Sequence, residues 1–222
     1  AALFGAEATI FLAKTVPEAF AERLRAKGAQ VVRAGDTYEE AMATAEKTAS
    51  DTGGTLLSDS SWPGYVDPAK AVMEGYLQLA TEAAAQLDEA PTHILLQAGV
   101  GGMAAAVAAL ARATWGDAPV IVVVEPKAAP AVLESLRAGR VVDTVGPVSD
   151  MGRLDCKTPS LVALAGLARD ADLCVTITEA EAHAAVEMLS AQGLATTPSG
   201  AAGLAALLCG RVAPGAQARV LT

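Results

Sequence analysis

The chain has 222 residues, enough to bury a core in one or two domains. Hydrophobic residues make up 52% of it and charged residues 18%, a balance that excludes an intrinsically disordered chain. The net charge of −9 argues against nucleic acid or an anionic membrane surface as a partner, and no apolar run reaches the ~18 residues of a membrane-spanning helix.

The first quarter of the chain alternates between strand and helix signals. Residues 1–6 resemble the last turn of a helix closed by Gly5, so we expect this chain to be part of a longer protein. Strands are predicted at residues 8–13, 30–33 and 55–58. Helices are predicted at residues 17–27 and from Asp36 or Thr37 through Met42 to about residue 49. Asp36 or Thr37 would cap the second helix. The alternation is typical of α/β domains with parallel strands.

The rest of the chain continues this alternation. Helices are predicted at residues 68–87, 129–138, 160–169 and 179–192. Two more are predicted from the glycine cluster after Gly99 to about residue 114, and from residues 197–200 to near Gly210. Strands are predicted to end at Gly99 and to span residues 120–124, 141–145, 173–177 and 219–222. Thr178 would cap one helix, and Gly139 and Gly193 would end two others. The fold class is therefore α/β.

A glycine cluster follows one of the apolar strands. Residues 94–96 are apolar, the stretch Gly99-Val100-Gly101-Gly102-Met103 comes next, and an alanine-rich helical pattern begins at once. Glycines at such a turn let backbone N–H groups close on an anion, and the helix dipole favours negative charge there. The pattern predicts a phosphate site; the alternative is a tight turn without a ligand.

The same glycines also fit a looser dinucleotide fingerprint. Gly99-x-Gly101-x-x-Ala104 follows a strand, and the next strand ends at Glu125, whose carboxylate could bond a ribose hydroxyl. An NAD-dependent dehydrogenase is therefore an alternative. Against it, some 90 residues of other α/β structure precede this strand, and Pro126 stiffens the place where the adenosine would lie.

Asp59 is a second candidate site residue. It follows the strand predicted at residues 55–58, and the carboxyl ends of parallel strands face the ligand crevice. A carboxylate there could act as an acid or base if burial raises its pKa. The alternative is an ordinary turn aspartate that caps backbone amides.

Several segments along the chain resemble diaminopropionate ammonia-lyases. The resemblance is carried by residues 3–8, 59–65, 73–76, 96–104, 124–126 and 154–160. That family belongs to the pyridoxal-phosphate (PLP) enzymes of fold type II, the tryptophan-synthase-β-like fold. The resemblance implies two lobes of parallel sheet flanked by helices. Residues 1–58 would be part of the smaller cofactor-covering lobe, and residues 59–222 most of the larger lobe with the phosphate loop.

The resemblance also implies a reaction and its residues. The reaction is an α,β-elimination of a β-substituted amino acid, 2,3-diaminopropionate most of all, to a 2-oxoacid and ammonia in a cytoplasmic homodimer. Asp59 would transfer a proton near the substrate amine, and Thr222 would lie beside the segment that meets the pyridine nitrogen. The cofactor phosphate would be held by Gly99, Val100, Gly101, Gly102 and Met103.

The chain departs from the family pattern in two places. Asp155 and Lys157 stand where close relatives have small residues, which affects the choice of substrate. The family's Schiff-base lysine lies in an N-terminal segment before a Gly-Asn-His-Gly-type loop, and neither feature occurs in these residues. We therefore expect a fragment that does not turn over alone. A threonine or serine dehydratase-like PLP enzyme and a non-catalytic scaffold are further alternatives.

The three cysteines carry one more expectation. Cys156, Cys174 and Cys209 are scattered without the spacing of a metal site. An odd, sparse count predicts free thiols in a reducing compartment.

Overall fold

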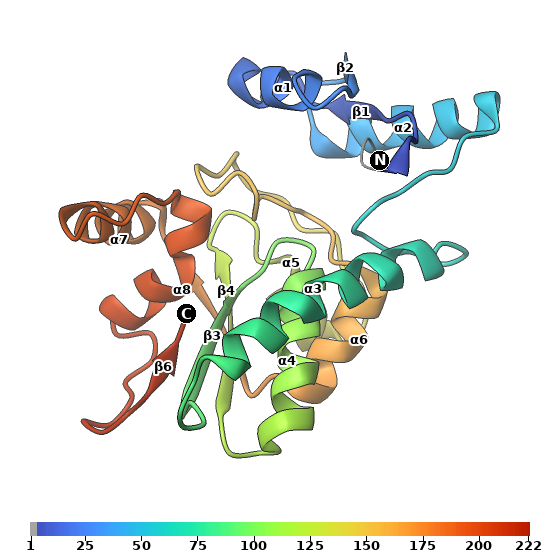
Figure 1. Ribbon diagram of the computed structural model, residues 1–222. Helices are drawn as coiled ribbons and strands as arrows, with labels where there is room; N and C mark the ends of the chain where they lie inside the picture. Colours follow the sequence, from blue (N-terminus) through green and yellow to red (C-terminus); the bar gives the residue numbers. More distant parts are fainter. Residues whose placement is uncertain (1–3) are drawn as a thin grey trace. The chain divides into compact units, whose positions relative to one another are not determined.

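The computed structural model describes residues 4–222, which form two compact units divided after Leu57 (Figure 1). The sequence places this division one residue later. The helical turn expected at residues 1–6 lies mostly outside the described residues; within them, Gly5 has a φ of +68°, as in a helix-ending glycine.

The first unit pairs two short strands and two helices. Strands β1 (Thr9–Leu12) and β2 (Gln30–Arg33) are parallel, with Thr9 opposite Gln30. Helix α1 spans Glu18–Arg25 and helix α2 spans Tyr38–Thr52. Thr37 caps α2 by accepting the backbone N–H of Glu40 at 3.2 Å, which confirms one of the two caps predicted for it.

The strand predicted at residues 55–58 is wrong. These residues form no strand, and the Leu57 side chain is 70% exposed. A β-strand exists only where a neighbour completes its hydrogen bonds, and the sheet of the first unit consists of β1 and β2 in the described chain. The Thr-Leu-Leu-Ser pattern therefore marks an extended connection.

The second unit is built on a four-stranded parallel sheet. Its order is β5-β4-β3-β6, and the strands span His93–Gln97 (β3), Val120–Pro126 (β4), Leu173–Ile177 (β5) and Val220–Leu221 (β6). Four predicted strands are thereby confirmed. The strand predicted at residues 141–145 is wrong: Val145 is 99% exposed, and the N–H of Thr144 donates to the carbonyl of Lys157 at 2.8 Å.

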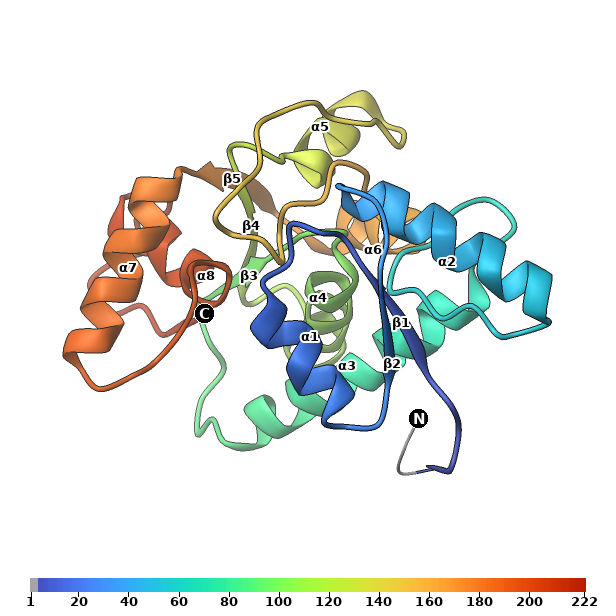
Figure 2. The same ribbon diagram turned by 90° about the horizontal axis from the view of Figure 1, so that it is seen from above.

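Helices cover both faces of this sheet. They span Asp67–Ala85 (α3), Gly102–Trp115 (α4), Ala131–Ala138 (α5), Leu161–Asp170 (α6), Glu179–Ala191 (α7) and Pro198–Leu208 (α8). Successive residues of β3 point to opposite faces, so Ile94 and Leu96 pack against α4 and α6, whereas Leu95 packs against α7 and α8. Figure 2 shows α7 and α8 on the other side of the strands from α4 and α6.

Small residues let these layers approach closely. Most of the buried positions of α4 and α8 are alanine or glycine. Thr178 caps α7 in a reciprocal capping box with Glu181, and Gly139 ends α5 in the left-handed conformation, as predicted. Among residues 4–222, no helix is both long enough and apolar enough to cross a membrane.

Candidate active site

The turn between β3 and α4 presents an open helix N-terminus. Gly101 precedes the first residue of α4 with a φ of +95°, a conformation that glycine adopts far more readily than other residues. No side chain of the described residues caps this end, and the first turn carries no acidic residue. The amides here therefore combine free N–H donors with the positive end of the helix dipole. The arrangement suits an anion.

Two of the glycines are also required by packing. A Cβ built on Gly99 would lie 2.8 Å from the carbonyl oxygen of Arg153 and 3.0 Å from Sγ of Cys156. A Cβ on Gly101 would lie 3.3 Å from both Cβ of Ala163 and Cδ1 of Leu167 in α6. Packing alone thus explains part of the glycine pattern, and it holds the backbone of the turn in one shape.

Asp59 lies beside this turn, although not at the end of a strand. Its main-chain oxygen is 3.6 Å from the Cβ position of Gly102, and Tyr76 of α3 lies 3.9 Å from the same point. Burial raises the pKa of Tyr76, and the charge of Asp59 raises it further. Asp59 itself is exposed. The structure thus brings together Asp59 and the glycine turn.

An aromatic turn holds the segment that carries Asp59. The rings of Trp62 and Tyr65 stack with their centroids 4.3 Å apart, and the two backbones bond to each other. The hydroxyl of Tyr65 accepts the N–H of Ser58 at 2.8 Å. The backbone is therefore tied down immediately before Asp59.

A buried pair of serines ties down the other side of Asp59. Ser61 Oγ lies 2.7 Å from Ser160 Oγ and accepts the N–H of Val162 at 2.9 Å. Ser160 Oγ accepts the N–H of Ser61 at 3.1 Å, and the N–H of Ser160 donates to the carbonyl of Val100 at 2.9 Å. Through Ser160, the Asp59 segment, the start of α6 and the glycine turn are joined.

We expect Ser61→Ala to lower the free energy of unfolding by about 1–3 kcal/mol, because it leaves the partly buried amide of Val162 and the buried hydroxyl of Ser160 without their partner. Urea denaturation of the purified protein measures the effect. Ser190→Ala, at an exposed position of α7, is the matched control. Equal stability of the two variants would contradict the structural role given to Ser61.

Glu125 does not fit the role that the dinucleotide alternative requires. Its side chain is fully buried, and its two carboxylate oxygens accept the N–H groups of Val132 and Leu133, each at 2.8 Å, at the start of α5. A carboxylate whose oxygens cap a helix beneath the surface cannot bond a ribose hydroxyl. The alternative of an NAD-dependent dehydrogenase is therefore wrong about Glu125, which cannot serve as the ribose ligand.

Burial gives Glu125 a measurable pH signature. Burial raises the pKa of Glu125 from 4.5 to about 7, against the two amide hydrogen bonds that lower it. The folded chain then binds more protons than the unfolded chain between pH 4.5 and 7. The contribution of Glu125 to stability is thus complete below pH 4.5 and is lost as the pH rises to about 7.

We expect the stability difference between wild type and Glu125→Gln to change by on the order of 3 kcal/mol from pH 4.5 to 7.5, in the direction that favours wild type at low pH. Urea denaturation across this range measures it. Glu187→Gln, at an exposed position of α7, should show no such change. A constant difference for Glu125→Gln would refute the raised pKa.

Thr222 lies one residue beyond β6. A Cβ on Gly203 of α8 would lie 3.2 Å from Cβ of Thr222 and 3.4 Å from Oε1 of Gln97. Gln97 ends β3, two residues before the glycine turn. In the pairing of β6 with β3, Ile94 lies opposite Leu221, so Thr222 lies beside Leu95 in the middle of β3.

Several residues around this site were not predicted from the sequence. Tyr76 and Cys156 line it, and Ser61 and Ser160 organise it. Tyr76 lies in a stretch already compared with the family, but no local pattern connects two serines so far apart in the chain. Within residues 4–222, no cysteine forms a disulfide, and no group of three potential metal ligands occurs.

Comparison with known proteins shows the family to which the chain is similar. The model of the pyridoxal-phosphate dependent enzyme family matches residues 1–222. Diaminopropionate ammonia-lyase of Salmonella typhimurium is 34% identical over 170 residues, which cover 74% of this chain and 39% of that protein. Human L-serine dehydratase/L-threonine deaminase is 30% identical over 205 residues, which cover 91% of this chain and 60% of that protein.

The solved structures agree with these relatives. Diaminopropionate ammonia-lyase from Escherichia coli, in complex with an aminoacrylate-PLP azomethine reaction intermediate, superposes with a TM-score of 0.91 at 25% identity. The match covers 99% of this chain and 61% of that one. In the sequence matches, the aligned residues span about two fifths of the curated diaminopropionate ammonia-lyases. The predicted tryptophan-synthase-β-like α/β fold is confirmed.

Proposed function

The chain belongs to the family of pyridoxal-phosphate dependent enzymes, and from this premise we propose that it is part of an ammonia-lyase. The reaction is the α,β-elimination of a β-substituted amino acid to a 2-oxoacid and ammonia. The proposed substrate is 2,3-diaminopropionate, supported by 34% identity to the Salmonella typhimurium enzyme. A threonine or serine dehydratase is the second candidate, supported by the 91% of this chain that the human relative covers.

The glycine turn fits the phosphate of the cofactor. The support is the uncapped start of α4, where no acidic side chain opposes an anion. The backbone amides that hold the phosphate in this proposal belong to Gly99, Val100, Gly101, Gly102 and Met103. Thr222 is proposed to lie beside the segment that meets the pyridine nitrogen. When bound, PLP supplies an electron sink for the bond to be broken at the substrate.

Asp59 is the proposed proton-transfer group. The observation that carries the proposal is the position of the Asp59 main chain, whose oxygen lies 3.6 Å from the Cβ position of Gly102, the first residue of α4. The charge of Asp59 also acts on Tyr76, which lies 3.9 Å from the same point. In this proposal the carboxylate exchanges a proton with the substrate near its amino group. The Trp62–Tyr65 turn and the serine pair keep the backbone of Asp59 in position.

The Schiff-base lysine is proposed to lie outside this chain. Lys157 directly follows residues that pack against Gly99, but its ammonium donates to the carbonyls of Ala128 and Pro147 and to Asp155. A lysine whose three N–H groups all have acceptors is poorly suited to attack a carbonyl.

The proposal extends to the organisation of the protein. The unit up to Leu57 is proposed as part of the smaller cofactor-covering lobe and Ser58–Thr222 as most of the larger lobe. We propose a cytoplasmic homodimer without nucleic-acid or membrane partners. The three cysteines, none of them in a disulfide, support the compartment, and the net charge of −9 supports the absence of these partners.

Substrate turnover by the whole protein tests this function. We expect 2,3-diaminopropionate to release ammonia and a 2-oxoacid faster than serine or threonine, with each enantiomer assayed separately. A preference for threonine or serine would favour the dehydratase. Cofactor binding without release from any of these amino acids would favour the non-catalytic scaffold.

A further inference from the structure

A long irregular segment covers the carboxyl end of the sheet. It connects α5 to α6 and contains neither helix nor strand over 139–160. Its contacts reach Ala128, just after β4, and Glu179, just after β5. Segments of this length without regular structure need their own side chains to hold them.

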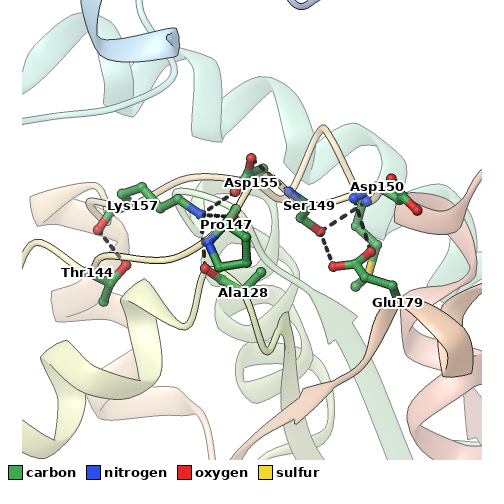
Figure 3. Close-up of polar contacts among 9 residues, drawn as sticks. Ala128, Thr144, Pro147, Ser149, Asp150, Asp155, Lys157 and Glu179 are labelled. Carbon is green, nitrogen blue, oxygen red and sulfur yellow. Dashed lines mark hydrogen bonds and ion pairs between the residues drawn. The ribbon is translucent and has the colours of Figure 1, made fainter.

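One ammonium group lies at the centre of this segment. Figure 3 shows Lys157 Nζ between three acceptors: the carbonyls of Ala128 and Pro147, each at 2.9 Å, and Oδ1 of Asp155 at 2.6 Å. The three acceptors come from the β4–α5 connection and from two points of the segment itself. The Lys157 side chain is 21% exposed and the Asp155 side chain 15%. Water therefore competes little for these bonds.

The hydrogen bonds of Lys157 and Asp155, which we call the clamp, continue from Asp155 to α7. Asp155 Oδ2 accepts the N–H of Ser149 at 3.1 Å, and Ser149 Oγ donates to Glu179 at 2.7 Å (Figure 3). The N–H of Asp150 donates to the other oxygen of Glu179 at 3.1 Å. The segment is thus attached at both of the strand ends that it crosses.

The clamped segment forms the wall behind the glycine turn. The three atoms nearest to a Cβ built on Gly99 all come from this segment. They are the carbonyl oxygen of Arg153 at 2.8 Å, Sγ of Cys156 at 3.0 Å and Cα of Leu154 at 3.2 Å. Residues 153–156 immediately precede Lys157 in the chain, and Asp155 lies between the contacting residues. The bonds of Lys157 therefore help to hold this wall, together with the bond from the N–H of Arg153 to Ser199 Oγ at 3.2 Å.

We propose that Lys157 is a positioning residue for the cofactor phosphate: it holds residues 153–156 against Gly99 and so keeps the amides of the glycine turn directed at one point. The identity of the ligand rests on the proposed function, whereas the hydrogen bonds of the clamp do not depend on it. It explains why a charged pair, Lys157 and Asp155, occupies this segment without lining the turn itself.

Two ligands that differ only in the phosphate test the inference. The dissociation constants of PLP and of pyridoxal are measured by absorbance titration of the whole protein. Lys157→Met keeps an unbranched side chain that is one atom shorter and removes its three donors. We expect it to weaken PLP binding by about 10-fold or more and to leave pyridoxal binding unchanged. Asp155→Asn, which removes the charge partner, should act in the same direction if Lys157→Met does not fold.

The control and the contrary results are distinct. Lys127→Met, at an exposed lysine just after β4, should change neither constant. Unchanged PLP binding by Lys157→Met, or equal loss of PLP and pyridoxal, would overturn the inference. A wild-type protein that binds neither ligand would refute the proposed function instead.

Hydrogen exchange followed by mass spectrometry tests the clamp without any cofactor. Lys157→Met should speed the exchange of amides in residues 99–104 and 149–157, whereas Lys127→Met should not. Wild-type exchange rates in residues 99–104 of Lys157→Met would overturn the inference even if the ligand of the turn were not PLP.

Discussion

Gly101→Asp is expected to abolish binding of PLP to the whole protein. The residue has a φ of +95°, and its Cβ would lie 3.3 Å from two side chains of α6, so any substitution strains the turn. Aspartate adds a negative charge where the amides bind the phosphate. Strain and repulsion together should weaken binding by about 100-fold or more, as measured by absorbance titration.

The same substitution at a distant glycine is the control. Gly193 follows α7 with a φ of +76°, and a Cβ built there meets nothing within 4 Å. Gly193→Asp should therefore retain wild-type affinity for PLP. An unchanged affinity in Gly101→Asp would remove the glycine turn from the cofactor site.

Asp59→Asn is expected to reduce turnover by about 100-fold in the intact protein, because the amide keeps the shape of the side chain but cannot exchange a proton. The PLP content should stay that of wild type. The ratio kcat/KM for 2,3-diaminopropionate measures the effect. Asp88→Asn, at an exposed position after α3, is the matched control. Full activity of Asp59→Asn would leave Asp59 as a turn residue.

A second measurement on Asp59→Asn does not depend on activity. The charge of Asp59 raises the pKa of Tyr76, beyond the larger effect of burial. Removing that charge should lower the pKa of Tyr76, which ultraviolet titration of the tyrosines detects. An unchanged titration would show that the two side chains do not interact in solution.

Local chemistry made much of the fold predictable. The turn after β3 combines an apolar strand, three glycines and an alanine-rich helix, and each of these signals acts over a few residues. The caps at Thr37 and Thr178 follow equally local rules. The resemblance to the family rests on such short stretches, which is why it indicated the correct fold.

Local sequence patterns did not predict the contacts between residues that are far apart in the chain. Residues 55–58 have strand-like composition, but no neighbouring strand in the described chain completes them. Glu125 has the spacing of a ribose ligand, yet the chain turns it inward to cap α5. Nothing in the local sequence pairs Ser61 with Ser160 or directs Lys157 to Ala128, since these contacts depend on how the helices pack.

A crystal structure of the whole protein with PLP tests the central claim most directly. We predict that the phosphate oxygens lie about 2.7–3.2 Å from backbone nitrogens of the turn from Gly99 to Met103, at the start of α4. A cofactor phosphate bound elsewhere, with the start of α4 facing only solvent, would contradict it.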